Sequence, residues 1–481
     1  MIDAIRLPLW LVVIGGVLAA WALLDQLLLP FVRWFLRRRD KVVIKEIDER
    51  LNLHLPPFKL IKKRVLIDRL MSDPKVLDAV EEYCQKHGIS TEAGLKKAEH
   101  YAKEIVPSFH AYIYFRIGYR ISKFVARLLY HVRIGYTDEE NLAKIDPHAS
   151  IVFLMNHRSN VDFMLLGYFA LSRAVLSFAV GEWARIWGLQ QLIRAMGAYF
   201  VRRGSGNPLY RCVLARYVQM ATEGGVMQAV FLEGGLSQDG KLREPKIGLL
   251  DYMLRDFDPE RERDIVFIPA GVNYDRVLED RTVLLDTGPG AGKKPRKNAV
   301  MTATAFIFQN IWQMVRGRWF RFGYAAVNFG RPVSMREYVK THNIDFHKLD
   351  KEARIDKVKN LASDLLHEVG KVIPVLPVSL IAYVFAESPD KAFSDLELKA
   401  CVQRLIKDLE AQGAHVYIPR QDRDYAITVG LRMLTLRHLI LEENNLYRAS
   451  ADDIEVLHYY ANSIAHFVPL GEPSNKSLSS S

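Results

Sequence analysis

The sequence predicts an α/β protein: a mostly parallel sheet flanked by helices, with helical regions before and after it and an N-terminal membrane segment. Short apolar runs rich in β-branched residues alternate with helical segments through the middle of the chain. Strands that alternate with helices in this way are typical of a parallel sheet covered on both faces. The chain has 481 residues, of which 49% are hydrophobic, and is therefore long enough for two or three ordered domains.

A long apolar stretch lies close to the N-terminus. Residues 7–24, LPLWLVVIGGVLAAWALL, are eighteen positions without a charge, near the minimum of about 17 residues for a spanning helix. We therefore predict that residues 1–40 form a membrane anchor, spanning or re-entrant, with a basic flank. The arginines that follow predict that the rest of the chain faces the cytoplasm from the inner membrane. A cleaved signal peptide and a helix lying in the interface are the alternatives.

The charge of the chain favours an anionic partner. The net charge is +11, and residues 31–70 contain twelve Lys or Arg against five Asp or Glu. A basic belt beside an apolar segment indicates a negatively charged membrane surface. We expect no nucleic-acid partner, because the sequence contains no zinc pattern, basic zipper or RNA-binding aromatic motif. The three cysteines are far apart and predict neither a metal site nor a disulfide framework.

Four regions follow the anchor. Residues 41–140 show helical spacing and are predicted to form a helical domain. Residues 141–372 are predicted to form the α/β domain. Its strand runs are SIVFLMN, VLSFAVG, AYFVRR, VMQAVFLEGG and DIVFIPAGVNYD, and its helical segments are 161–171, 183–196, 208–223 and 246–255. Residues 373–470 are predicted to be mainly helical, with a strand pair near 415–428, and the polar tail 471–481 to be disordered.

The first strand run ends in a histidine that is followed five positions later by an aspartate. Active groups of parallel sheets gather in the loops beyond the strand ends, and this spacing lets a loop His157 meet Asp162 in the first turn of the next helix. A neutral histidine accepts a proton, and a carboxylate fixes its tautomer and stabilises the imidazolium. Because no Gly-x-Ser-x-Gly turn supplies a nucleophile, the pair suits activation of a substrate hydroxyl. A histidine that merely caps the strand end is the alternative.

Two further loops carry arginines or a proline. The run GAYFVRR ends in Arg202 and Arg203, whose guanidinium groups suit bidentate contact with phosphate. A solvated sheet edge is the other interpretation of this pair. The run IPAGVNYDR contains Pro269 and is predicted to wall the same cleft.

A glycine-rich loop follows the remaining strand. Glu233 is followed by Gly234 and Gly235, which permit a tight turn and close approach of the backbone to a ligand. Ser237 adds a hydroxyl, and Lys246 adds charge. An ordinary strand-to-helix loop, with Glu233 paired to a base, is the alternative.

Taken in order, these four segments resemble the four sequence blocks of the glycerolipid acyltransferase family. The blocks here read NHRSNVD, GAYFVRR, EGGLSQDGK and IPAGVNYDR, and the first matches the family's HX4D motif at His157 and Asp162. The EGG form, the NYDR ending and LHYYANSIAHF at 457–467 are similar to the glycerol-3-phosphate acyltransferase branch. The resemblance covers about residues 145–470.

The resemblance implies a membrane-bound enzyme that makes lysophosphatidic acid, the first step of phospholipid synthesis. A long-chain acyl group would pass from a thioester of coenzyme A or acyl carrier protein to the sn-1 hydroxyl of glycerol 3-phosphate. His157 would take the hydroxyl proton while Asp162 holds the ring, with no further cofactor and no metal. The residues implied to bind substrate are Arg158, Arg202, Arg203, Glu233, Gly234, Gly235, Ser237, Lys246 and Pro269.

The third block departs from the pattern of the branch. It usually reads EGGRSRTG, with its first arginine tied to the acceptor, but Leu236 and Gln238 stand at the arginine positions here. Lysophosphatidate, dihydroxyacetone phosphate or another alcohol is therefore an alternative acceptor. A non-catalytic lipid-binding membrane protein is the alternative from another class. Residues 306–323 interleave aromatics with arginines and predict either an interfacial segment or a core helix.

Overall fold

The structure is a computed structural model. Most of the predicted anchor, including residues 7–24, and the whole predicted tail fall outside the part of the chain that it describes. Most of the predicted interfacial segment 306–323 also falls outside it. The described residues are 34–36, 38–40, 42–44, 56–170, 175–181, 189–202, 204–285, 321–346 and 348–468. Within these ranges, no helix combines the length and the apolar character that crossing a membrane requires.

The centre of the molecule is an eight-stranded sheet in the order β1-β7-β6-β2-β5-β3-β4, with β8 paired to β6. Strands β2 to β6 run parallel, whereas β7 and β8 are antiparallel to β6. This arrangement confirms the predicted mostly parallel sheet. The strands are β1 His131–Thr137, β2 Ser150–Met155, β3 Ser177–Val180, β4 Tyr199–Phe200, β5 Gln228–Phe231, β6 Ile265–Tyr274, β7 Tyr324–Phe329 and β8 Val333–Ser334.

All five predicted strand runs form strands of this sheet, namely β2 to β6. The predicted helix 208–223 is α10, Pro208–Glu223, with Asn207 as its N-cap and proline at its first position. Strand β1 lies inside the region predicted to be helical. Most of its residues are exposed, so its sequence lacks the apolar run by which the other strands are recognised.

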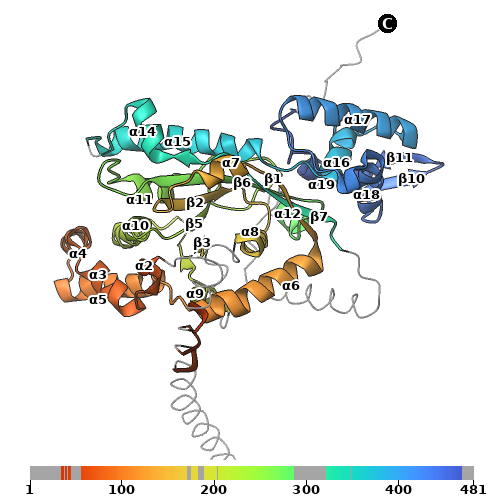
Figure 1. Cartoon of the computed structure of the whole chain (residues 1–481). Coiled ribbons are helices and arrows are strands. Elements are labelled where there is room, and N and C mark those ends of the chain that lie inside the picture. Colours follow the sequence, from red (N-terminus) through yellow and green to blue (C-terminus); the bar gives the residue numbers. More distant parts are fainter. Residues whose placement is uncertain are drawn as a thin grey trace, which may run out of the picture.

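Helices cover both faces of the sheet (Figure 1). Helices α14 and α15 lie on one face, with α15 packed on β6 and β2, whereas α8 and α10 lie on the other. Helix α6 packs on α8, and α3, α4 and α5 pack on α10. The bounds are α2 Pro57–Leu60, α3 Lys63–Met71, α4 Pro74–His87, α5 Thr91–Ile105, η1 Ile113–Gly118, α6 Tyr119–Leu129, α7 Glu139–Ala143, α8 Asp162–Ala170, α9 Leu189–Ala195, α11 Gly248–Leu254, α12 Asp280–Leu285, α14 Met335–His342 and α15 Lys351–Lys371.

A C-terminal lobe surrounds the buried helix α16 and lies beside the β7 end of the sheet (Figure 1). The predicted strand pair near 415–428 is wrong. Helix α18 begins there because the Asp422 side chain accepts the Tyr425 N–H as an N-cap. The hairpin of this lobe is β10–β11, which pairs with β9. The bounds are α16 Pro377–Glu387, β9 Phe393–Ser394, α17 Asp395–Ala411, η3 Pro419–Gln421, α18 Arg423–Thr435, β10 Ile440–Glu443, β11 Leu446–Ala449, η4 Ala451–Asp453 and α19 Ile454–Ala461.

One buried carboxyl joins the lobe to the end of β6. The two oxygens of Asp275 accept the backbone N–H groups of Tyr324, at 2.7 Å, and Val378, at 3.1 Å. Burial raises the pKa of Asp275 to about 7, although both N–H groups oppose this shift. Asp275 therefore holds the first turn of α16 beside the start of β7.

We expect acid to weaken the contact between His466, near the end of the C-terminal lobe, and the Gly370 carbonyl. The Nε2 atom of His466 lies 2.9 Å from the Gly370 carbonyl, and burial lowers the pKa of His466 to about 4. The unfolded chain binds this proton near the ordinary pKa of about 6.5, so stability is lost as the pH falls from there towards 4. The residue as a whole is partly open to solvent, which makes this loss small. Between pH 7 and pH 5, the melting temperature of the wild type should therefore fall further than that of His466→Gln, which keeps a donor for Gly370. Equal falls in the two proteins would contradict this assignment.

Candidate active site

The structure brings His157 and Asp162 together at the end of β2. His157 lies in the loop after this strand, and Asp162 is the first residue of α8. The Nδ1 atom of His157 is 2.9 Å from Oδ2 of Asp162, and both side chains are buried. The backbone N–H groups of Arg158 and Ser159 donate to the same oxygen, at 2.8 and 3.0 Å. These donors and the helix N-terminus hold the carboxylate of Asp162 in place beside the histidine. We refer to His157 and Asp162 as the dyad.

A tyrosine that the sequence did not mark as a site residue completes the environment of the aspartate. Tyr274, the last residue of β6, donates its hydroxyl to the second carboxylate oxygen of Asp162. Burial and the charge of Asp162 raise the pKa of Tyr274, so its hydroxyl stays protonated. The only sequence signal was its place in NYDR, which did not show that it reaches the dyad.

The glycine-rich loop fixes the backbone of the dyad loop. One carboxylate oxygen of Glu233 accepts the His157 N–H at 2.8 Å, and the other accepts the Arg243 N–H at 3.0 Å. Burial raises the pKa of Glu233, and these N–H groups partly oppose that shift. The backbone N–H of Ser237 donates to the His157 carbonyl at 2.9 Å. In this structure Glu233 and Ser237 therefore position the histidine.

Two glycines of this loop adopt positive φ where no side chain fits. A Cβ on Gly234, at φ +66°, would lie 2.7 Å from Cγ of Lys246. A Cβ on Gly240, at φ +89°, would lie 1.9 Å from the Tyr459 carbonyl of α19. Because Gly240 touches Tyr459, the loop packs directly on the C-terminal helix α19. Of the other predicted residues of this loop, Gly235 is buried and Lys246 is exposed.

Arg158 is a buried arginine with unused hydrogen-bonding capacity. Its guanidinium lies 4.6 Å from the centre of the Tyr459 ring, and one terminal nitrogen donates to the Gly240 carbonyl. Its Nε and its other terminal nitrogen have no hydrogen-bond partner in the part of the chain that the structure describes. Arg158 also lines a small hollow, together with Asn156, Glu233, Gly240, Lys241, Leu242, Ile373 and Ser463. Buried unpaired donors are costly, and a guanidinium suits an anion with several oxygens.

The structure does not place Arg202 at the dyad. The Nε atom of Arg202 donates to Glu104 of α5 at 2.9 Å, and its guanidinium lies 5.3 Å from the ring centres of Tyr101 and Tyr210. Strand β4, which precedes it, is the sheet edge and lies three strands from β2, or about 14 Å at the usual spacing of strands. Arg203 lies outside the described residues.

Pro269 is part of the central sheet, and Leu236 lies in the glycine-rich loop beside Arg243. Pro269 is buried within β6 and pairs with Leu154 of β2. The backbone carbonyl of Leu236 accepts a hydrogen bond of 3.1 Å from Arg243. The Arg243 guanidinium thus lies against the loop position at which the branch usually has an arginine. Across the described ranges, no group of three or more His, Cys, Asp or Glu side chains is placed to hold a metal ion.

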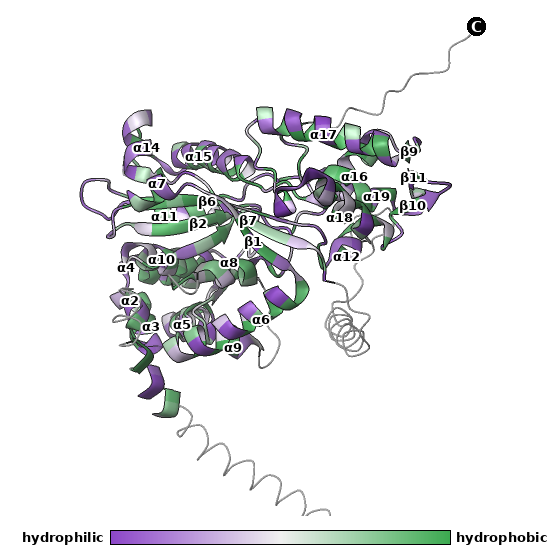
Figure 2. Ribbon diagram, turned by 45° about the vertical axis from the view of Figure 1, so that its right-hand side comes forward, coloured by the Kyte–Doolittle hydropathy of each residue, from purple (hydrophilic) through white to green (hydrophobic). Residues whose placement is uncertain are grey.

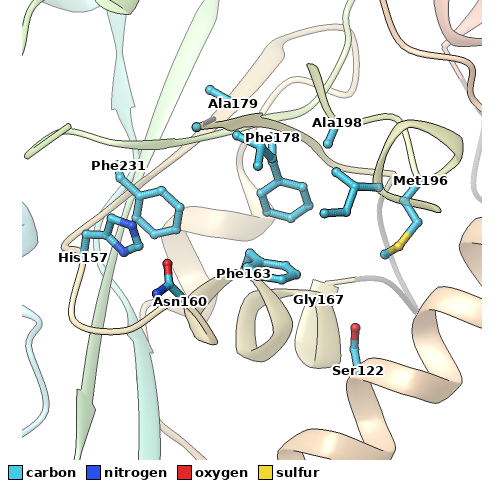
Figure 3. A pocket seen from close by; sticks show the side chains of 13 residues that line it. Ser122, His157, Asn160, Phe163, Gly167, Phe178, Ala179, Met196, Ala198 and Phe231 are labelled. Atoms are coloured by element: carbon cyan, nitrogen blue, oxygen red, sulfur yellow. The ribbon is translucent and has the colours of Figure 1, made fainter. Parts of the chain in front are cut away.

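An apolar pocket begins at the dyad histidine. Figure 3 shows His157 at one end of it and Ser122 and Met196 at the other. The His157 ring stacks on Phe231, with ring centres 4.0 Å apart. The pocket space of about 710 Å³ opens to solvent and is lined by Ser122, His157, Asn160, Phe163, Gly167, Phe178, Ala179, Val180, Gly181, Ile193, Met196, Ala198 and Phe231. A mainly apolar lining next to a base suits a substrate with a hydrocarbon part.

Two family models match the chain. The model described as acyltransferase matches residues 133–273, which contain the dyad and strands β2 to β6. The model described as glycerol-3-phosphate acyltransferase C-terminal region matches residues 310–470. The fold, the HX4D dyad and these matches support one class of protein: residues 133–273 are similar to acyltransferases, and they contain the dyad.

Similar proteins specify the branch of that family. A glycerol-3-phosphate acyltransferase of Xylella fastidiosa is 25% identical over 420 residues, which are 85% of this chain and 47% of that protein. One of Pseudomonas aeruginosa is 28% identical over 348 residues, which are 70% of this chain and 40% of that protein. Together with the C-terminal family model, these similarities support the glycerol-3-phosphate acyltransferase branch. The chain spans less than half the length of these relatives.

A solved structure also shows similarity. The 1-acyl-sn-glycerophosphate acyltransferase PlsC of Thermotoga maritima is 15% identical, and the match covers 61% of this chain and 94% of that one. Its TM-score is 0.29.

The hydroxyl of Tyr274 can be tested by a single-atom change. Tyr274→Phe removes one of the donors that hold the Asp162 carboxylate, so the aspartate should orient His157 less well. We expect kcat for acyl transfer to fall about tenfold with little change in KM, because the loss of one hydrogen bond worth about 1.4 kcal/mol corresponds to this factor. Tyr130→Phe is the matched control, because its buried ring lies 5.2 Å from that of Tyr274 and its hydroxyl bonds the Arg276 carbonyl instead. A kcat loss of the same size in both variants would argue against a positioning role.

Proposed function

We propose that the chain transfers an acyl group from a thioester to the sn-1 hydroxyl of glycerol 3-phosphate and so forms lysophosphatidic acid. The observation that carries this proposal is the dyad at one end of an apolar pocket (Figure 3). The pocket suits the hydrocarbon chain of the donor, and the dyad suits the removal of a proton from the acceptor. Similarity to the glycerol-3-phosphate acyltransferase branch supports the choice of acceptor.

The dyad performs the proton transfers of this reaction. Because Nδ1 of His157 is bound to Asp162, Nε2 remains to accept the hydroxyl proton. The acceptor oxygen attacks the thioester carbonyl, the C–S bond then breaks, and the imidazolium returns the proton to the leaving thiolate. Asp162 stabilises the imidazolium. No acyl-enzyme, metal or resident cofactor takes part in this scheme.

Arg158 is our choice for the principal ligand of the acceptor phosphate. It is adjacent to His157 in the dyad loop, it is buried, and two of its nitrogens have no partner among the described residues. Arg243 lies over Leu236 and supplies positive charge at the loop position where the branch usually has an arginine. Arg202 is held by Glu104, so it would have to leave that pair to reach a phosphate. Its role and that of Arg203 as phosphate ligands stay predictions.

We also propose that the reaction takes place at the cytoplasmic face of the inner membrane. A basic belt at residues 31–70 and the apolar residues 7–24 support this location. The product is an amphiphile, which leaves most easily into a bilayer. The donor is an acyl thioester of coenzyme A or acyl carrier protein.

Removal of the base tests the proposed chemistry. His157→Ala should lower the transfer of palmitate from palmitoyl-CoA or palmitoyl carrier protein by more than about 10³-fold, since the base and its orientation are both lost. His342→Ala, an exposed histidine at the end of α14, is the matched control and should retain full activity. Unchanged transfer by His157→Ala would refute the mechanism. Wild-type transfer to dihydroxyacetone phosphate or lysophosphatidate, but not to glycerol 3-phosphate, would instead identify another acceptor.

Two arginine-to-lysine substitutions test which strand end binds the phosphate. Arg158→Lys keeps the positive charge but loses the planar set of donors, and we expect the KM for glycerol 3-phosphate to rise about tenfold. Arg202→Lys retains an ion pair with Glu104 and should change this KM by less than about twofold. A larger KM effect at position 202 than at position 158 would place the phosphate at the end of β4.

A further inference from the structure

Helix α6 and the π-helical turn η1 before it expose a strip of large apolar side chains. Ile117, Ile121 and Phe124 are 37%, 41% and 65% exposed. Their spacing of four and three residues puts them on one side of the helix. Such a strip on an ordered helix is unusual for a surface in contact only with water.

The buried residues of this helix, which pack on the rest of the protein, fix the orientation of the strip. Tyr114, Gly118, Ser122 and Ala126 are buried at every fourth position. Ser122 closes the far end of the apolar pocket (Figure 3). A Cβ on Gly118 would lie 2.7 Å from the Met196 side chain, so the helix cannot turn its apolar strip inwards without breaking this packing.

The charged residues in the segment that carries the strip are all basic. Residues 105–137 contain five arginines and lysines and no aspartate or glutamate. Arg120 and Arg127 are exposed beside the strip, and Lys123 is half-buried, with its amino group 5.5 Å from the ring centre of Tyr119. Figure 2 shows polar and apolar residues in alternating bands along α6. Apolar side chains bordered by bases are typical of a helix that lies in the headgroup layer of anionic lipids.

A second apolar and basic group lies beside the start of η1. Trp34 and Val42 are 54% and 56% exposed, and the Arg38 guanidinium lies 5.6 Å from the centre of the Trp34 ring. Asp40 attaches this segment to the body of the protein through the ring of His110, at 2.9 Å, and the N–H of Tyr112, at 2.7 Å. Tryptophan beside arginine is typical of a membrane interface.

We propose that the exposed face of α6 is seated on an anionic phospholipid surface, with Ile117, Ile121 and Phe124 in the interface and the neighbouring bases on lipid phosphates. Three side chains on one helix are a small area for a stable protein partner, which usually needs about 800 Å² on each side. The absence of any acid in residues 105–137 matches a negative surface. The far end of the apolar pocket, which Ser122 of α6 lines, then lies close to the lipid surface. This inference does not depend on which acceptor the dyad uses.

A local probe tests the proposal, because residues 7–24 would bind vesicles whatever α6 does. In a Cys212→Ser, Cys401→Ser background, in which the remaining Cys84 is buried, Phe124→Cys is labelled with an environment-sensitive fluorophore in the full chain. Leu396→Cys on α17, at a position 79% exposed, is the matched control. Vesicles of phosphatidylcholine and phosphatidylglycerol should raise the emission at position 124 at least twofold, and spin-labelled lipid should quench it, with no change at position 396.

Two outcomes of this labelling experiment would overturn the proposal. A label at position 124 that behaves like the one at position 396 would show that α6 does not meet the lipid. A label that is already shielded before vesicles are added would show that another segment of the chain covers this face.

Reversing the charge of two basic residues of α6 provides a second test of the proposal. At saturating vesicles, Arg120→Glu with Lys123→Glu should at least halve the emission change at position 124, because each base near an anionic surface strengthens the local contact by about 1 kcal/mol. Arg404→Glu with Lys407→Glu is the matched control, since both residues are exposed on α17 at the same spacing. An equal weakening by the two double variants, or none by the first, would contradict a role for the bases of α6.

Discussion

The arrangement of the site depends on one buried carboxylate. Asp162 receives hydrogen bonds from two backbone N–H groups of the dyad loop and from Tyr274, and it lies 2.9 Å from the ring of His157. A carboxylate without these donors would be costly to bury. Because the donors come from the loop after β2 and from the end of β6, satisfying this one charge sets the path of the loop, the start of α8 and the direction of the histidine.

The sequence predicted those elements whose signals are local. The apolar runs of β2 to β6 and the helix with its Asn207 cap are continuous stretches, and each was found where it was expected. The meeting of His157 and Asp162 was predictable for the same reason, since only one loop separates them. Tyr274, in contrast, reaches Asp162 across 112 positions, and no periodicity or spacing in the sequence encodes such a contact.

The order of strands explains the largest difference between the expected and observed site. Loops that follow one another in sequence meet only if their strands are neighbours, and strand order is a non-local property. Strand β2 lies between β5 and β6, so the loops that carry His157 and Glu233 and the end of β6 meet. Strand β4 is at the edge, and the arginine after it pairs with Glu104 of α5. Strand β1 was missed because its exposed residues carry little apolar signal.

The contact between Gly240 and α19 has a consequence for the order in which the protein is assembled. Arg158 lies against the ring of Tyr459, a residue 301 positions further along the chain. At about 5 to 20 residues per second, a ribosome takes roughly 15 to 60 s to synthesise that interval. The dyad loop and the parallel strands emerge first, so Arg158 lacks its aromatic neighbour while this interval is synthesised. The nascent chain therefore holds both residues of the dyad before α19 can pack against Gly240 and Arg158.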